Sequence, residues 1–221
     1  MVQKIQSRQI AGRLLALKLL SYVDRADVLV LGLPPGGVPV AQEIASTLRL
    51  PLDVLVVRKL AAPGIEGVAM GAVAHGEIEI VDPDAVEEFN VSDTELAAIL
   101  NAERGELKRK EAAYRSSRPA FDLRDRGVVL VDDGIETGAT MRAAIETVRR
   151  LGATRVIVAA GVATLSVSLE LRAEADEAIY VLRPREFRAT ASFYEDFPEL
   201  RDEDVRSLLR EAWKSDTPNA A

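Results

Sequence analysis

The sequence of 221 residues is long for one ordinary domain and short for two, and its 48% hydrophobic and 29% charged residues predict one folded domain over 1–221. The formal net charge of −7 argues against binding to nucleic acid, because such binding depends mainly on Lys and Arg. With no cysteine and with His75 as the single histidine, the chain excludes disulfides, thiol nucleophiles, cysteine-rich zinc sites and metal sites with two histidines.

The start of the chain shows no apolar segment followed by a cleavage site of small residues. The apolar runs VLVLGL, VLVVRKL and VIVAAGVA are shorter than the ~18 residues that a membrane span needs. We therefore expect a cytoplasmic protein that does not bind membranes.

The first half of the chain contains alternating helical and strand patterns. In chain order, the spacing of apolar residues predicts a helix over 8–20, a strand over 28–33, a helix to about Leu50 and a strand over 53–57. The residues PPGG between the first strand and the second helix predict a tight turn. The residues after the second strand, RKLAAPGIEG, predict a loop, and GAVA and EIEIV predict a hairpin around His75. We expect 58–81 to form a mobile loop and hairpin.

The second half is more regular. A charged helical stretch runs from Pro83 to about Arg118 and includes a capping box at Ser92 and Glu95. Strands over 128–131, 156–162 and 178–182 then alternate with helices over 141–151 and 166–175. This alternation predicts an α/β fold with a central parallel sheet of about five strands flanked by helices, and a ligand site at the carboxyl ends of the strands.

The motif with the clearest chemistry is VVLVDDGIETGAT, which begins at Val128. A buried strand is followed by Asp132 and Asp133, and a turn rich in glycine and threonine then opens a helix. Backbone N–H groups and threonine hydroxyls over 137–140 would bind a phosphate monoester at the positive end of that helix. The motif is neither a P-loop nor a GxGxxG turn. Paired carboxylates beside a phosphate site indicate a sugar phosphate, whose vicinal hydroxyls donate hydrogen bonds to carboxylates.

At these residues the sequence resembles the type I phosphoribosyltransferases. GLPPGG is similar to the first pyrophosphate loop of that family, and RKLAAPG is similar to the segment that opens its mobile catalytic loop, so the resemblance covers most of the chain. Its nearest resemblance is to a group of stand-alone bacterial members. The resemblance implies the type I phosphoribosyltransferase fold with a small C-terminal hood, which we expect over about 183–200.

The resemblance also implies a reaction and a set of site residues. The expected reaction transfers the 5-phosphoribosyl group of 5-phosphoribosyl 1-diphosphate to a nitrogen acceptor, expected to be a nucleobase, with release of pyrophosphate. Mg²⁺ is the expected cofactor, held through the substrate diphosphate with no protein ligand assigned. The expected catalytic residues are Asp132, Asp133, Glu136 and Lys59. The expected substrate-binding residues are Gly36, Gly37, Arg58 and Lys59 at the pyrophosphate, Asp132 and Asp133 at the ribose 2′ and 3′ hydroxyls, and Thr137, Gly138, Ala139 and Thr140 at the 5′-phosphate.

Two residues depart from the family pattern. Pro35 stands where relatives often carry Arg or Lys, which removes a donor beside the pyrophosphate. Glu136 stands inside the phosphate loop, where it could contact the incoming nucleobase, repel the phosphate, or only favour the helix dipole. Both favour an alternative function, a non-catalytic protein that binds ribose phosphates and acts as a regulator. A sugar-phosphate hydrolase or isomerase fits less well because it leaves RKLAAPG unexplained.

Six aromatic residues lie between Tyr180 and Trp213. Such a cluster could stack on a flat acceptor or could belong to the core, and the hood is expected over 187–197 within the segment named above. Read without the family, Arg58 and Lys59 would also fit a solvated strand end. Many relatives are dimers, and the apolar face of the predicted helix after Pro83 leaves a homodimer open.

Overall fold

The computed structural model describes residues 3–65, 69–115 and 118–215. Its elements include a five-stranded sheet in the order β2-β1-β6-β7-β8, in which every neighbouring pair is parallel. The strands of this central sheet are β1 (Val28–Gly32), β2 (Leu52–Val54), β6 (Gly127–Ile135), β7 (Arg155–Ala163) and β8 (Glu177–Leu182). The predicted α/β fold with about five parallel strands is confirmed.

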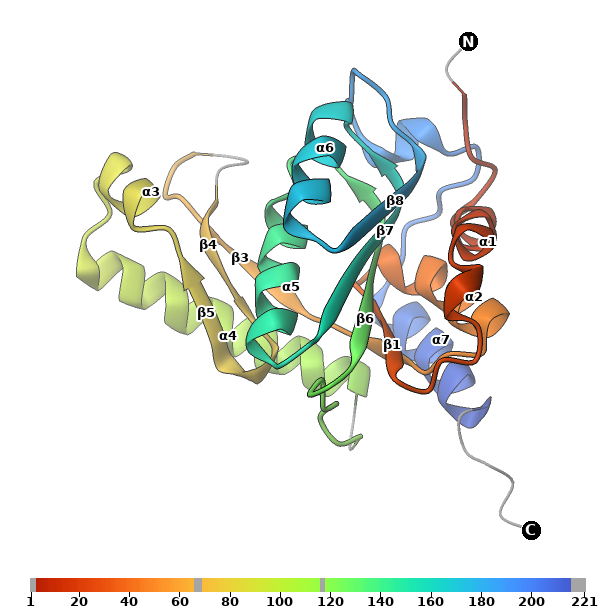
Figure 1. The fold of residues 1–221 in the computed structure, drawn as a ribbon. Helices are drawn as coiled ribbons and strands as arrows, with labels where there is room; N and C mark the ends of the chain where they lie inside the picture. Colours follow the sequence, from red (N-terminus) through yellow and green to blue (C-terminus); the bar gives the residue numbers. More distant parts are fainter. Residues whose placement is uncertain (1–2, 66–68, 116–117, 216–221) are drawn as a thin grey trace.

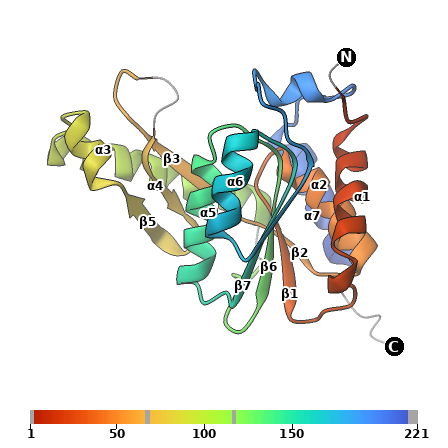
Figure 2. The same ribbon diagram turned by 45° about the horizontal axis from the view of Figure 1, so that its top comes forward.

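Helices cover both faces of the central sheet (Figures 1 and 2). One face carries α1 (Arg8–Lys18), α2 (Gly37–Leu48) and α7 (Asp202–Ser215), and the other carries α5 (Ala139–Arg150) and α6 (Leu165–Glu174). All five residues of β1 are buried, with Val28 and Val30 in the core beneath α1 and α2, and Leu29 and Leu31 in the core beneath α5. Burial on both faces explains why the strands read as continuous apolar runs.

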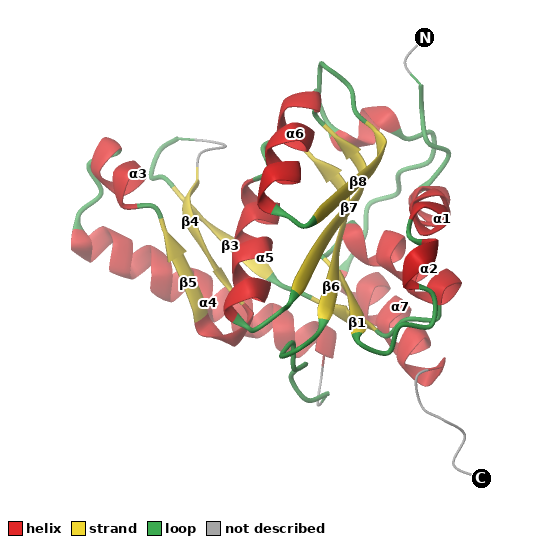
Figure 3. Ribbon diagram, viewed as in Figure 1, coloured by secondary structure: helices red, strands yellow, loops and turns green. Residues whose placement is uncertain are grey.

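A second sheet lies beside the first, with α5 between them (Figure 3). It is antiparallel, with the order β3-β4-β5. Its strands are β3 (Val57–Ala61), β4 (Ala69–Ala74) and β5 (Ile78–Val81), and the helices packed against it are α3 (Pro83–Glu88) and α4 (Asp93–Arg115). Short 3-10 helices complete the described elements at Leu20–Tyr22, His75–Glu77 and Thr190–Phe193.

The structure corrects the prediction for residues 53–59. The expected single strand is divided between β2 and β3, which belong to different sheets, and Arg58 and Lys59 lie inside β3 instead of opening a loop. Leu55 and Val56, which join the two strands, are buried like the strands themselves. The apolar run therefore carries no signal for the change of sheet. Residues 66–68 of the expected mobile loop lie outside the described residues.

The hairpin predicted around His75 is confirmed as β4 and β5. The charged stretch after Pro83 forms two helices instead of one, and Asn90, between them, adopts a positive φ of 51°. The capping box at the start of α4 is confirmed, because the Ser92 backbone N–H donates to Glu95 and the Glu95 N–H donates to the Ser92 hydroxyl oxygen. None of the helices in the described residues has both the length and the apolar character that crossing a bilayer requires.

Candidate active site

The two loops predicted to bind substrate lie side by side at the carboxyl edge of the central sheet. β1 and β6 are parallel neighbours, so the loop after Gly32 and the residues after Val131 emerge at the same edge. Leu33 N–H donates to the carbonyl of Val131 at 2.9 Å, which joins the loop to β6. The structure therefore brings the predicted glycine turn and the predicted acidic pair together. The Pro34–Pro35 peptide bond in this loop is cis.

β6 is longer than predicted, because Asp132 and Asp133 lie inside the strand and not beyond its end. The last pair between β1 and β6 is Gly32 with Val131, whereas β6 continues to pair with β7 as far as Ile135. Beyond Val131, the edge of β6 on the β1 side is therefore lined by the glycine turn that leads into α2.

Gly36 and Gly37 allow this turn to approach the acidic residues closely. A Cβ atom at Gly36 would lie 2.1 Å from Oδ2 of Asp133, and one at Gly37 would lie 2.2 Å from the carbonyl oxygen of Val131. A side chain at Gly37 would require β6 or the turn to move, and one at Gly36 would displace the Asp133 carboxylate. Gly37 is therefore needed for contact between the turn and β6, and Gly36 for the present position of the Asp133 carboxylate.

Substitution of Gly36 tests this close approach. Gly36→Ala is expected to lower the free energy of unfolding by about 1–3 kcal/mol, because the methyl group would overpack against the Asp133 carboxylate. Gly105→Ala is the matched control, since an added Cβ meets nothing within 4 Å in the exposed interior of α4 and should stabilise the protein by about 0.5–1 kcal/mol. Urea denaturation measures both. Equal stability of the two variants would contradict the close packing.

The acidic pair is electrostatically unequal. Burial and the charge of neighbouring Asp133 raise the pKa of Asp132 well above its usual range. Asp133 is 8% exposed and pairs with a buried arginine, Arg8, whose Nε donates to its Oδ2 at 2.7 Å. One carboxylate is thus ion-paired, while ionisation of its neighbour is electrostatically unfavourable.

The predicted phosphate loop surrounds the N-terminus of α5. Gly138 is the N-cap of this 12-residue helix and has a positive φ of 79°, and the helix begins at Ala139. The first N–H groups of a helix lack partners within it, and the helix dipole favours an anion there. Thr137 is exposed and Thr140 half-buried, and Arg142 donates to the carbonyl of Thr137 at 2.9 Å. This geometry suits an anion such as a phosphate group.

The remaining predicted site residues lie apart from this edge or point to solvent. Arg58 is on β3 of the second sheet, and its Nε donates to Glu103 of α4 at 2.8 Å, while Lys59 beside it is exposed. Glu136 is exposed, and its backbone carbonyl accepts a hydrogen bond from Thr164 at 3.4 Å. His75, as expected, is a hairpin residue, and its Nδ1 lies 2.5 Å from Glu111 of α4.

Sequence reasoning missed Arg8 and Gly161 at this edge, and it considered Tyr194 only for the hood or the core. Arg8 pairs with Asp133, Tyr194 donates from its hydroxyl to the Asp133 carbonyl at 2.7 Å, and Gly161 on β7 makes room for that hydroxyl. Two signals were available. An arginine in the first turn of a helix opposes the dipole, and an isolated glycine in the strand run VIVAAGVA indicates a close approach.

The expected hood segment packs against β6 next to the acidic pair. Thr190 lies against Gly134, where a Cβ would be 2.3 Å from the Thr190 side chain, and Phe193 and Tyr194 are buried in the core. Phe187 and Phe193 contact each other with ring centroids 5.2 Å apart. Of the two functions considered for these aromatic residues, Phe193 and Tyr194 serve the core.

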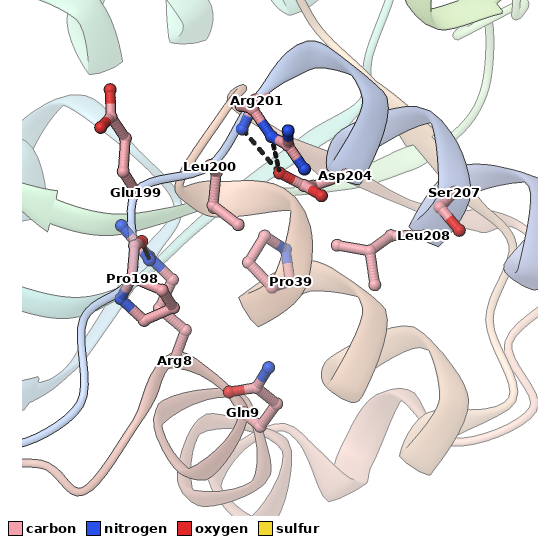
Figure 4. A pocket seen from close by; sticks show the side chains of 10 residues that line it. All are labelled: Arg8, Gln9, Pro39, Pro198, Glu199, Leu200, Arg201, Asp204, Ser207 and Leu208. Atoms are coloured by element: carbon pink, nitrogen blue, oxygen red, sulfur yellow. Dashed lines mark hydrogen bonds and ion pairs between the residues drawn. The ribbon is translucent and has the colours of Figure 1, made fainter.

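A cavity of about 500 Å³ lies between α1, α2 and α7, next to Arg8 (Figure 4). Its lining includes Arg8, Pro39, Pro198, Asp204 and Leu208. It includes none of the catalytic or substrate-binding residues predicted from the sequence, although it includes the last residues of the expected hood. Among the described residues, no cluster of three or more His, Cys, Asp or Glu side chains could hold a metal ion.

A family model, two curated proteins and a solved structure match most of this chain. The family model described as "Phosphoribosyl transferase domain" matches residues 1–184. Two Mycobacterium tuberculosis proteins named "Putative phosphoribosyl transferase" are each 37% identical over 202 residues, which cover 91% of this chain and 45% of theirs. The chain therefore spans about half the length of these curated relatives. The crystal structure of TT1426 from Thermus thermophilus matches with a TM-score of 0.82 and a sequence identity of 40%. The match covers 95% of this chain and 99% of that chain.

Proposed function

Because the chain belongs to the phosphoribosyl transferase domain family, we propose that it transfers the 5-phosphoribosyl group of 5-phosphoribosyl 1-diphosphate to a nitrogen acceptor, a nucleobase, and releases pyrophosphate. The observation that carries this proposal is the acidic pair on β6 between the glycine turn after β1 and the N-terminus of α5. This arrangement offers acceptors for a diol and donors for a phosphate at one edge of the sheet.

The proposed roles follow from charge and hydrogen bonding. Asp132 and Asp133 accept hydrogen bonds from the ribose 2′ and 3′ hydroxyls, and their charge stabilises the positive charge that develops on the ribose as the bond from C1 to the diphosphate breaks. Residues 137–140 hold the 5′-phosphate at the start of α5. As the new bond from C1 to nitrogen forms, Glu136 accepts the proton that the acceptor nitrogen loses.

Mg²⁺ fits this site as a companion of the substrate. It commonly binds one or two carboxylates together with substrate phosphates, so the lack of a larger ligand cluster among the described residues is compatible with it. Asp132 is the carboxylate we assign to it, and the bound ion would offset negative charge on the departing pyrophosphate. Lys59 and Arg58 would add positive charge there, although Arg58 would first have to leave Glu103.

Calorimetric titration with 5-phosphoribosyl 1-diphosphate and Mg²⁺ tests the proposal, followed by a panel of nucleobases scored by pyrophosphate release. We expect Asp132→Asn to weaken binding about 100-fold, equivalent to about 2.7 kcal/mol. Asp24→Asn is the control, because Asp24 is in an exposed pair with Arg49. Asp132 is preferred to Asp133 for substitution because a change at Asp133 would leave buried Arg8 without its carboxylate. Undiminished binding by Asp132→Asn would contradict the proposed site.

A non-catalytic ribose-phosphate-binding protein is the second candidate. It is favoured by the Arg58–Glu103 ion pair and by Pro35, since both reduce the number of donors available to a pyrophosphate. This candidate predicts that the titration shows binding but that no acceptor in the panel causes pyrophosphate release.

A further inference from the structure

Arg8 is held from three directions. Its Nε donates to Oδ2 of Asp133 and its Nη1 donates to the carbonyl of Pro198, both at 2.7 Å. Its guanidinium carbon lies 3.6 Å from the centroid of the Phe197 ring. The guanidinium plane and two of its nitrogens therefore have fixed partners, which defines the orientation of the side chain.

The same C-terminal segment also holds the backbone of Asp133. The Tyr194 hydroxyl donates to the Asp133 carbonyl at 2.7 Å, and the Tyr194 ring packs on Phe197 with centroids 5.0 Å apart. Asp133, Arg8, Phe197 and Tyr194 thus form a closed ring of contacts. In this ring, the side chain of Asp133 is fixed through Arg8 and its main chain through Tyr194.

Stability alone is a poor explanation for Arg8. Arg8 is 6% exposed, and a buried ion pair is often no more stabilising than apolar residues of similar size. A positive charge in the first turn of α1 also opposes the helix dipole. Arg8 also lines the 500 Å³ cavity, whereas Asp133 does not, and Figure 4 shows the Arg8 side chain reaching Pro198.

We propose that Arg8 is a positioning residue, which holds the Asp133 carboxylate in the orientation that receives the ribose 2′ hydroxyl. This inference rests on the proposed function. A carboxylate has about four lone-pair sites, and Arg8 engages one oxygen through one N–H. Acceptor capacity therefore remains for a sugar hydroxyl.

The readout is the preference for ribose 5-phosphate over 2-deoxyribose 5-phosphate, measured by calorimetry. A hydroxyl bound to a charged carboxylate makes the wild-type preference about 10- to 100-fold. We expect this ratio to fall toward unity in Arg8→Gln. Arg8→Lys keeps the charge but loses the planar guanidinium, so it should retain only part of the preference. A purely structural role would weaken binding of both sugar phosphates and leave their ratio unchanged.

Arg13→Gln is the matched control, because Arg13 is on the same helix in an exposed pair with Glu43 and should keep the wild-type ratio. If Arg8→Gln does not fold, Tyr194→Phe removes only the hydroxyl that holds the Asp133 carbonyl, and it should lower the ratio severalfold. A wild-type ratio in Arg8→Gln, or in Tyr194→Phe if that variant is used, overturns the positioning role but leaves the proposed function intact. Failure of the wild type to bind either sugar phosphate or 5-phosphoribosyl 1-diphosphate overturns both.

Discussion

Replacing Arg115 with alanine is expected to lower the free energy of unfolding by about 3–5 kcal/mol. Arg115 is the last residue of α4 and is 5% exposed, and its Nη1 lies 3.2 Å from Oδ1 of Asp53 on β2. Asp53 is 3% exposed, and its second ion-pair partner, Arg118, is more distant at 3.8 Å. Burial raises the pKa of Asp53 and lowers that of Arg115, so each charge depends on the other in the folded protein.

Guanidinium chloride denaturation measures this effect. Arg124→Ala is the control, because Arg124 is in an exposed pair with Asp122 and should cost less than about 1 kcal/mol. The double variant Arg115→Met with Asp53→Leu should recover much of the loss, since it replaces both buried charges with apolar side chains. If Arg115→Ala were no more destabilising than Arg124→Ala, the folded protein would not depend on the buried Arg115–Asp53 pair for its stability.

Asp132→Asn is expected to stabilise the free protein at alkaline pH while it weakens ligand binding. The pKa of Asp132 is raised in the folded state, so the folded protein holds this proton more tightly than the unfolded chain does. The associated stability is fully present below the unfolded pKa of about 3.9 and is lost as the pH rises through the raised folded pKa. Asparagine resembles the neutral carboxyl group and does not titrate.

At pH 8 the Asp132→Asn variant should therefore unfold about 2–4 °C above the wild type for each kcal/mol gained, and the difference should disappear near pH 4. Thermal unfolding monitored by circular dichroism across this range measures the effect. Asp24→Asn should not gain stability at pH 8, because Arg49 lowers the pKa of Asp24. A wild type as stable as Asp132→Asn at pH 8 would contradict this prediction. A gain would mean that the site retains a charge that lowers the stability of the free protein.

The parts predicted correctly from sequence are those encoded by contiguous residues. The parallel sheet follows from alternating apolar runs, and the motif from Val128 to Thr140 places carboxylates, turn and helix start in one short segment. The family resemblance read from that motif is confirmed by the match over residues 1–184. The assignment of individual residues to substrate groups remains a prediction.

Errors occurred where the outcome depended on distant parts of the chain. The separation of β2 from β3 depends on the packing of α5 and α4 against the second sheet. The local sequence LDVLVVRKL contains no residue pattern that predicts this change of sheet. Arg58 forms an ion pair with Glu103, a residue 45 positions away in the sequence. Arg8 and Pro198 are 190 positions apart, so no local pattern could bring them together.

The bridge between Ile5 and Tyr194 has a consequence for the order of folding. Ile5 N–H donates to Phe193, and the N–H groups of Glu195 and Asp196 donate back to Ile5 and Gln6, so two segments from opposite parts of the sequence lie side by side. Contacts between residues so far apart in the sequence cost loop-closure entropy, so we expect them to form late in folding. The sheet can therefore assemble before Asp133 acquires its partners. During synthesis, the contacts that hold Asp133 through Arg8 and Tyr194 can therefore form only after residues 193–198 have left the ribosome.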